Sequence, residues 1–301
     1  MKKFLSVLMA GAMLFGVLTL AGCGDTTEPA AEEGTTTEDT TTTAEFTTVT
    51  EGVLTMSTNA AFPPYEMTDD SGNIVGIDAE IAAAIAEKLG LELQIDDMDF
   101  DGALAAPQSG KSDIVMAGVT VNEERQLVLD FSNTYANGVQ KVIVAEGSDI
   151  TMENLGEQQI GTQKGTTGNI LTTDEFGEDH VIAYDDAIAA VQALNNGQID
   201  CVVIDSAVAD NLVEANPGLT TLDTDYANED YAIGVAKGNT ALLDAINTAL
   251  QELIDDGTVQ SIIDKYIPTD GTAADEAGTT DEAGATDEAG ATDGAEADTA
   301  A

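Results

Sequence analysis

The chain has 301 residues, with 56 acidic side chains against 9 lysines and arginines and a formal net charge of −47 at pH 7. This charge argues against a nucleic-acid partner, whose phosphates require a basic surface, and against electrostatic attachment to anionic lipid. One histidine and two cysteines are too few for a zinc site built from several such ligands, so we predict no metal and no cofactor. The length allows one large domain or two ordinary ones.

The N-terminus is typical of an exported protein. Residues 1–3 are basic, residues 4–20 are apolar, and Leu-Ala-Gly-Cys at 20–23 matches the bacterial lipobox. That match implies cleavage before Cys23, lipidation of its sulfur and acylation of the new N-terminus, for instance with palmitate. The alternatives are an uncleaved anchor or an ordinary signal peptide. We therefore expect 1–22 to be a lipoprotein signal peptide, and the mature chain to be anchored to the cell membrane on the extracellular or periplasmic side.

Both ends of the mature chain are compositionally biased. Residues 23–51 are rich in Thr, Glu and Ala, which predicts a flexible, self-repelling tether. Residues 269–301 repeat the pattern DEAGxT, with Asp-Glu pairs starting at Asp275, Asp281 and Asp287. With no large apolar residue in it, this segment is predicted to be a disordered acidic tail.

Strand and helix patterns alternate through the remaining 52–268. Apolar runs bounded by turn residues predict strands at 53–57, 91–95, 114–116, 139–144, 159–162, 181–184, 201–204 and 231–235. Helical spacing and caps predict helices from 78 to 89, from about 102, from 167, from 186 to 196, from 206 to 215 and from 242 to 257. The alternation predicts an α/β fold with parallel sheets covered by helices, and its extent favours two lobes over one sheet.

Arg125 is the only arginine in the sequence. A strand at 114–116 and a turn of small residues at 117–120 precede it, and Asn122 is a suitable cap for a short helix. A guanidinium fits a carboxylate with two parallel hydrogen bonds, and ligands bind at the carboxyl ends of strands in such sheets. The setting is that of a carboxylate site. A surface ion pair with an acidic neighbour is the alternative.

Other strand-end residues would complement Arg125 around a zwitterion. Thr167 begins a helix, whose N–H groups and dipole favour a carboxylate. Asp205 would hold an ammonium group with the help of the Gly118 carbonyl and the Thr120 hydroxyl. Simpler interpretations exist, because Asp205 precedes a serine as an N-cap does and Thr120 can bond back to its own turn.

Two phenylalanines, Phe62 and Phe100, would flank the carbon skeleton of such a ligand. Next to two prolines, Phe62 is equally compatible with a place in the core, and Tyr65 favours a structural role. Cys201 lies in the apolar run CVVI and is expected to be a buried small side chain.

Long segments of the chain resemble the bacterial extracellular solute-binding proteins of family 3, the polar amino acid receptors of ABC importers. In order, they are STNAAFPPYEM, VGIDAEIAAAIAEKLGLEL, MDFDGALAAPQSGKSDIV, AGVTVNEER, DFSNTYANG, KGTTG and LNNGQIDCVVIDSAVA. They cover essentially all of 52–268. The resemblance implies a two-lobed type II periplasmic-binding-protein fold with two crossover hinge strands. Lobe 1 would comprise 52–136 and 231–268, and lobe 2 would comprise 137–230.

The resemblance also implies a role for each matching residue. Arg125 would bind the α-carboxylate with the backbone of Thr167, and Asp205 would bind the α-ammonium group with Gly118 and Thr120. The remaining ligand contacts would come from Phe62, Phe100, Asn59 and Gln163. The lobes would close over an amino acid by hinge bending, and a monomer would present the closed form to an ABC transporter permease.

Asn59 stands where the family often has Asp, which weakens the case for an arginine or lysine ligand. With Gln163 it favours a polar neutral side chain such as that of glutamine. Two rival functions stay open. One is an enzyme similar to cyclohexadienyl dehydratase, built on the same fold, for which Glu66 and Asp205 are the candidate acids. The other is a sensory module that signals through a partner.

Overall fold

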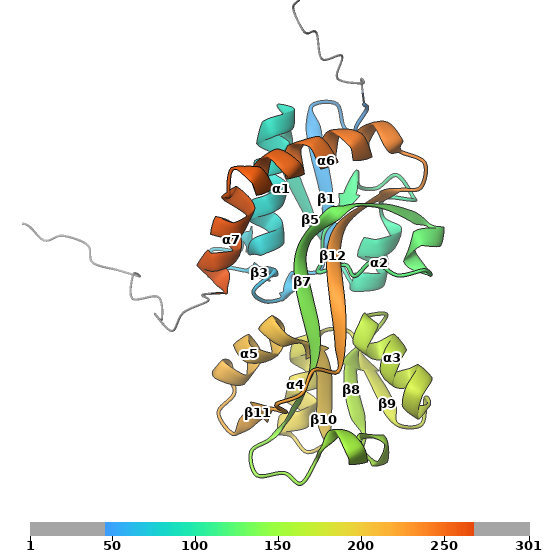
Figure 1. Ribbon diagram of the computed structural model, residues 1–301, viewed down its shortest axis with the longest axis vertical. Helices are drawn as coiled ribbons and strands as arrows, with labels where there is room; N and C mark the ends of the chain where they lie inside the picture. Colours follow the sequence, from blue (N-terminus) through green and yellow to red (C-terminus); the bar gives the residue numbers. More distant parts are fainter. Residues whose placement is uncertain (1–45, 268–301) are drawn as a thin grey trace, which may run out of the picture. The chain divides into compact units, whose positions relative to one another are not determined.

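The computed structural model describes residues 46–267, and these all belong to one compact unit of the chain. The predictions for the signal peptide, the lipidated Cys23, most of the tether and the acidic tail fall outside these residues. Within them, strands and helices alternate along the chain as expected (Figure 1).

Nine strands form one hydrogen-bonded sheet among the described residues, in the order β5-β1-β6-β12-β7-β10-β8-β9, with β11 paired to β7. Their bounds are β1 Val53–Thr58, β5 Glu92–Asp97, β6 Ile114–Val115, β7 Leu129–Ala145, β8 Ile160–Gln163, β9 Val181–Tyr184, β10 Cys201–Asp205, β11 Leu219–Thr221 and β12 Ala227–Ala236. A small separate sheet contains β2 Ala61–Phe62, β3 Glu66–Thr68 and β4 Ile74–Val75.

Two long strands, β7 and β12, run through both lobes and join them (Figure 1). One end of β12 pairs with β6 in lobe 1, and β7 pairs with β10 in lobe 2. Both pairings, and the pairing of β7 with β12, are antiparallel. The prediction of parallel sheets throughout is therefore wrong for these strands, because each crosses between lobes against the direction of its neighbours. Within the lobes, β1 with β5 and β6, and β8 with β9 and β10, are parallel as predicted.

Most of the helices pack on this sheet through the apolar faces that their sequences supply, and the last one packs on two other helices. They are α1 Ile77–Leu89, α2 Phe100–Ala105, α3 Thr167–Phe176, α4 Ala187–Asn195, α5 Ser206–Ala215, α6 Thr240–Asp255 and α7 Thr258–Tyr266. In α1, Ile77, Ile81 and Ile85 are fully buried along one face, and Gly90 ends the helix in the left-handed conformation, with φ of 71°.

The C-terminal part of lobe 1 differs from the prediction in one respect. Gly257 was expected only to end a helix, whereas α7 starts directly after it. With φ of 82°, Gly257 turns the chain so that Val259 and Ile262 point into the core. The spacing of these two side chains was the sequence signal for a further helix.

Candidate functional site

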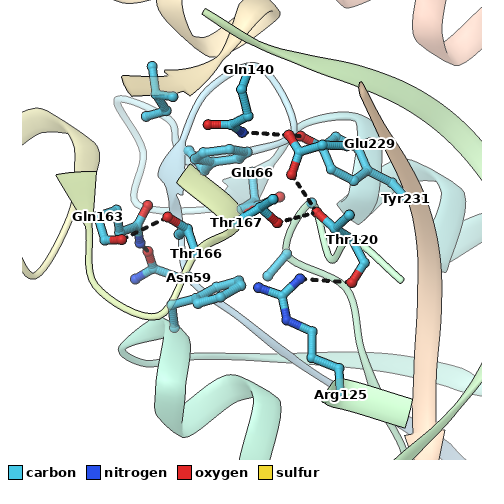
Figure 2. Close-up of a pocket in the computed structure, with 15 residues that line it drawn as sticks. Asn59, Glu66, Thr120, Arg125, Gln140, Gln163, Thr166, Thr167, Glu229 and Tyr231 are labelled. Carbon is cyan, nitrogen blue, oxygen red and sulfur yellow. Dashed lines mark hydrogen bonds between the residues drawn. The ribbon is translucent and has the colours of Figure 1, made fainter. Parts of the chain in front are cut away.

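A cavity lies between the two lobes, next to the strands that join them (Figure 2). Its lining comes from strand-end loops of both lobes and from the crossing strands. The lining residues are Asn59, Phe62, Glu66, Phe100, Ala117, Gly118, Thr120, Arg125, Gln140, Gln163, Thr166, Thr167, Ile204, Glu229 and Tyr231. All of the predicted ligand residues except Asp205 are in this set.

Arg125 is buried in the lining, with 6% of its surface exposed. Instead of an α-helix, a single 3₁₀ turn, Arg125–Leu127, carries it, and Asn122 Oδ1 accepts from the Arg125 backbone N–H at 2.8 Å. The guanidinium carbon lies 5.3 Å from the centre of the Phe100 ring. Burial lowers the pKa of Arg125, opposed by neighbouring acids of which Glu229 is the strongest. The surface-pair interpretation is thereby excluded, because the charge faces the cavity.

Four direct contacts hold the segment from the end of β8 to the start of α3 against lobe 1. Arg125 Nη2 donates to the Gly165 carbonyl oxygen at 3.1 Å, and Thr167 Oγ1 donates to Thr120 Oγ1 at 2.9 Å. Further contacts come from Gln163 to Asn59, at 2.8 Å, and from Lys164 to Asp101, at 2.7 Å. The lobes are therefore closed over the cavity.

Glu229, on β12, is the most heavily bonded acid in the cavity (Figure 2). Its carboxylate accepts from Thr120 Oγ1 at 2.6 Å, from Gln140 Nε2 at 2.5 Å and from the Tyr231 hydroxyl at 3.1 Å. These donors come from the turn after β6 and from both crossing strands. Glu229 thus links the cavity to the two strands that join the lobes.

Asp205 lies behind Tyr231 and does not line the cavity. Its Oδ1 accepts from the backbone N–H groups of Ala207 and Val208, which confirms the N-cap interpretation for α5. Its Oδ2 accepts from the Tyr231 hydroxyl at 3.0 Å. Burial raises the pKa of Asp205 to about 6. Because the single hydroxyl proton of Tyr231 faces both Asp205 and Glu229, the two carboxyls share one donor.

Glu66 and Asp78 form a pair of buried carboxyls on the lobe 1 side, each with no exposed surface. Asp78 accepts from the Gly118 backbone N–H at 2.9 Å and from the Tyr135 hydroxyl at 2.7 Å. Burial raises the pKa of Asp78 to about 6. Burial, followed by the charge of Asp78, raises the pKa of Glu66 well above its usual range.

Several lining residues were not predicted as ligand contacts, among them Glu66, Gln140, Thr166, Glu229 and Tyr231. Gln140 carried a detectable signal, because it is a polar residue in the buried run of a strand and needs a partner there. Glu229 had none, since its position opposite Gly138 depends on the register of two strands far apart in sequence.

Comparison with known proteins agrees with this geometry. The model of the bacterial extracellular solute-binding proteins, family 3, matches residues 54–269. This chain belongs to that family. It is 30% identical to a probable histidine-binding protein from Neisseria gonorrhoeae, over 91% of this chain and 98% of that protein.

Solved structures of similar proteins share the fold. An ancestral arginine-binding protein bound to glutamine is 39% identical, with a TM-score of 0.69, over 72% of this chain and 99% of that one. The arginine-, lysine-, histidine-binding protein ArtJ from Geobacillus stearothermophilus is 29% identical, with a TM-score of 0.69, over 73% and 96% of the two chains. The two-lobed type II periplasmic-binding-protein architecture predicted from the sequence is confirmed.

Members of family 3 work in the periplasm or outside the cell, and the same holds for this solute-binding protein. Within residues 46–267, no helix combines the length and the apolar character that spanning a membrane requires. The same residues contain no cluster of three or more His, Cys, Asp or Glu side chains able to hold a metal ion.

Proposed function

We propose that this family 3 protein binds an L-amino acid between its lobes and delivers it to an ABC importer. The observation that carries the proposal is the single arginine of the chain, buried in the wall of the interlobe cavity. A buried guanidinium without a carboxylate partner is suited to receive one from a ligand. Two similar solved structures, of an ancestral arginine-binding protein, have glutamine or arginine bound and support the same class of ligand.

Arg125 would hold the α-carboxylate. A guanidinium carries five N–H donors. Here Nη1 donates to the Thr120 carbonyl and Nη2 to the Gly165 carbonyl, which leaves further N–H groups for a ligand. Thr167 is the first residue of α3, where backbone N–H groups have no partner within the helix and favour an anion. Together these groups would fix one end of the amino acid.

The α-ammonium group would lie among hydrogen-bond acceptors, on the other side of Thr120 from the α-carboxylate. We propose Asp205 as its charged partner, with the Gly118 carbonyl and the Thr120 hydroxyl beside it. Glu229 accepts from the Thr120 hydroxyl at 2.6 Å and belongs to the same set of acceptors. Phe62, Phe100, Asn59 and Gln163 would enclose the rest of the ligand.

Lobe 1 would comprise 52–136 and 231–268, and lobe 2 would comprise 137–230. Hinge bending between the two lobes would open and close the site. We further propose that the chain is a monomer, that Cys23 carries the lipid anchor, and that the protein catalyses no reaction on its ligand. A Cys23→Ser variant tests the anchor. The unaltered protein should carry fatty acyl chains on its first mature residue by mass spectrometry and the variant none, whereas an unlipidated unaltered protein would contradict the anchor.

A thermal-shift screen of the twenty amino acids with the full chain tests the proposed function. We expect at least one of them to raise the melting temperature in a concentration-dependent manner, because a ligand of the folded state stabilises it. No shift with any amino acid at millimolar concentration would refute the proposal. Turnover of arogenate or prephenate would instead support an enzyme similar to a dehydratase.

A further inference from the structure

Four buried oxygen atoms on residues of the cavity wall have no hydrogen-bond partner. They are Glu66 Oε1, Glu66 Oε2, Gln140 Oε1 and Gln163 Oε1. Each such atom left unpaired in the interior destabilises a protein, because it has lost its hydrogen bonds to water. The two amide oxygens can only accept hydrogen bonds, and both Glu66 oxygens accept once that carboxyl is ionised. A ligand that donates hydrogen bonds would therefore satisfy these side-chain atoms of the cavity wall.

The orientation of the two glutamine amides follows from their neighbours. The Met98 carbonyl accepts from Asn59 Nδ2, so Asn59 Oδ1 is an acceptor and Gln163 approaches it with Nε2. Gln140 likewise directs Nε2 to the Glu229 carboxylate. In both glutamines the remaining atom is the oxygen. Flipping either amide would set an oxygen against an acceptor.

Buried acidic side chains around the cavity outnumber buried cationic ones. Glu66, Asp78 and Asp205 have no exposed surface and Glu229 has 4%, whereas Arg125 is the buried cation of this region. An α-carboxylate and an α-ammonium group cancel, so a neutral amino acid leaves the acidic excess unchanged. A second positive charge on the ligand reduces it.

We infer that the ligand is an amino acid with a cationic side chain, of the class of arginine, lysine and histidine, and that Glu66 binds the cation. The inference rests on the proposed amino acid function. Figure 2 shows Glu66 and Arg125 on different sides of the cavity, so a ligand carboxylate on Arg125 leaves Glu66 for the other end. An acidic side chain would add a further negative charge to this acidic region.

The inference replaces the expectation of a neutral side chain, which depended on Asn59. Both polar atoms of the Asn59 side chain already have partners, in Met98 and Gln163. Asn59 therefore positions Gln163, and the acid that selects the ligand lies seven positions further along the chain, at Glu66.

Binding of a cation at Glu66 should release a proton. Asp78 at the start of α1, Asp205 at the start of α5 and Asp97 on β5 are the charged groups that act on Glu66, and all are acidic. Together with burial they raise the pKa of this carboxyl well above its usual range and so favour its protonated form. A cation beside it stabilises the carboxylate, so the proton leaves as the ligand enters.

Isothermal titration calorimetry on the full chain tests the inference, with L-arginine, L-lysine, L-histidine, L-glutamine and L-glutamate as ligands. We expect at least one cationic amino acid to bind at least tenfold more tightly than glutamine. Glu66→Gln, which keeps the shape of the side chain, should remove at least tenfold of that affinity and change the affinity for glutamine by less than threefold. Glu92→Gln, at an exposed position, is the matched control and should change neither.

Titrations at pH 7 in phosphate and in Tris measure the proton. The cationic ligand should release up to one proton on binding to the unaltered chain and none on binding to Glu66→Gln. Glutamine binding with no preference for a cationic ligand would overturn the inference and leave the proposed function intact. An equal effect of Glu66→Gln on both ligand classes would overturn it as well. Binding of no amino acid at all would overturn both.

Discussion

Arg125 donates through Nη2 to the carbonyl oxygen of Gly165, 3.1 Å away, and so connects a side chain of lobe 1 to the backbone of lobe 2. The same guanidinium donates through Nη1 to the Thr120 carbonyl at 2.8 Å and packs over the Phe100 ring. One side chain therefore lines the proposed carboxylate site and also holds the lobes together. Ligand affinity and lobe closure should respond together when it is changed.

Replacing Arg125 with alanine should abolish detectable amino acid binding. Two charge-assisted hydrogen bonds to a carboxylate contribute about 1.5–3 kcal/mol each, so their loss lowers the affinity by at least about a hundredfold. The fold should persist, because the residue sits at the cavity and outside the apolar core. Calorimetry measures the affinity, and circular dichroism measures the fold.

Lys164→Ala is the matched control for that variant. Lys164 also bridges the lobes, with Asp101 at 2.7 Å, but its side chain is 62% exposed. Exposed ion pairs contribute about 0–1 kcal/mol, so affinity should change by less than about fivefold. A loss equal to that of Arg125→Ala would show that bridging the lobes, and not binding a carboxylate, explains both.

Gly165→Ala should weaken ligand binding by hindering closure. Gly165 has φ of 74°, and a Cβ atom there would lie 2.2 Å from Asp101 Oδ1, across the lobe boundary. Gly147 has nearly the same φ, 75°, with open space around it, so Gly147→Ala carries the backbone strain alone. We expect a loss of affinity of up to about fivefold for the first variant, because the Asp101 carboxylate must move away from its ion pair with Lys164, and little change for the second. Equal affinities in the two would contradict the steric account.

Asp205 should make the protein more stable as the pH falls. Its pKa is about 6 in the fold, against about 3.9 in an unfolded chain. Its contribution is thus complete below pH 3.9 and is lost as the pH rises through 6. Between pH 5 and pH 7.5 the loss amounts to about 1.4 kcal/mol of unfolding free energy. Asp205→Asn keeps a capping side chain and should lack this loss in urea unfolding at the two pH values.

The same variant separates two roles of Asp205. If Asp205 only caps α5, Asp205→Asn should leave the affinity for the amino acid unchanged, because asparagine caps a helix about as well as aspartate. If Asp205 instead binds the α-ammonium group, as we propose, Asp205→Asn removes the charge of that partner. We then expect the affinity for the amino acid to fall at least tenfold at pH 7.5. Calorimetry with the ligand found in the amino acid screen distinguishes these outcomes.

Thr120→Val should loosen the network around Glu229. Valine keeps the shape of threonine but removes the donor 2.6 Å from Glu229 Oε1 and the acceptor for Thr167 Oγ1. A lost hydrogen bond to a charged group lowers the unfolding free energy by about 1.5–3 kcal/mol. Thr248→Val, at an exposed position on α6, is the control and should change stability by less than about 1 kcal/mol. Equal unfolding midpoints for the two variants would contradict this network.

Local patterns were sufficient to predict most of the helices and the loops of the cavity. The apolar face of α1, its end at Gly90 and the start of α3 at Thr167 depend on residues within a few positions of one another. Phe62 and Phe100 reach the cavity because each begins or ends an element at the edge of a lobe. Such features are encoded in short stretches of sequence.

Features that depend on strand register were missed. The predicted strand at 139–144 is the second half of β7, because polar residues in 129–138 hide the continuous strand that crosses between the lobes. The partners of Glu229, at Gln140 and Thr120, meet only once β7 and β12 are paired. Asp205 shows the reverse case, because its capping role is local and was visible, whereas its contact with Tyr231 was not.

The position of β12 in the sheet has a consequence for how the chain is assembled. In lobe 1, β6 lies between β1 and β12, and α6 packs against α1. Both β12 and α6 follow the whole of β8 to β11 in sequence. Strand β6, in the N-terminal part of lobe 1, thus gains its neighbour β12 only after lobe 2 has been synthesised. An export route that carries the chain unfolded, N-terminus first, would keep the edge of β6 unpaired until nearly all of the folded region has emerged.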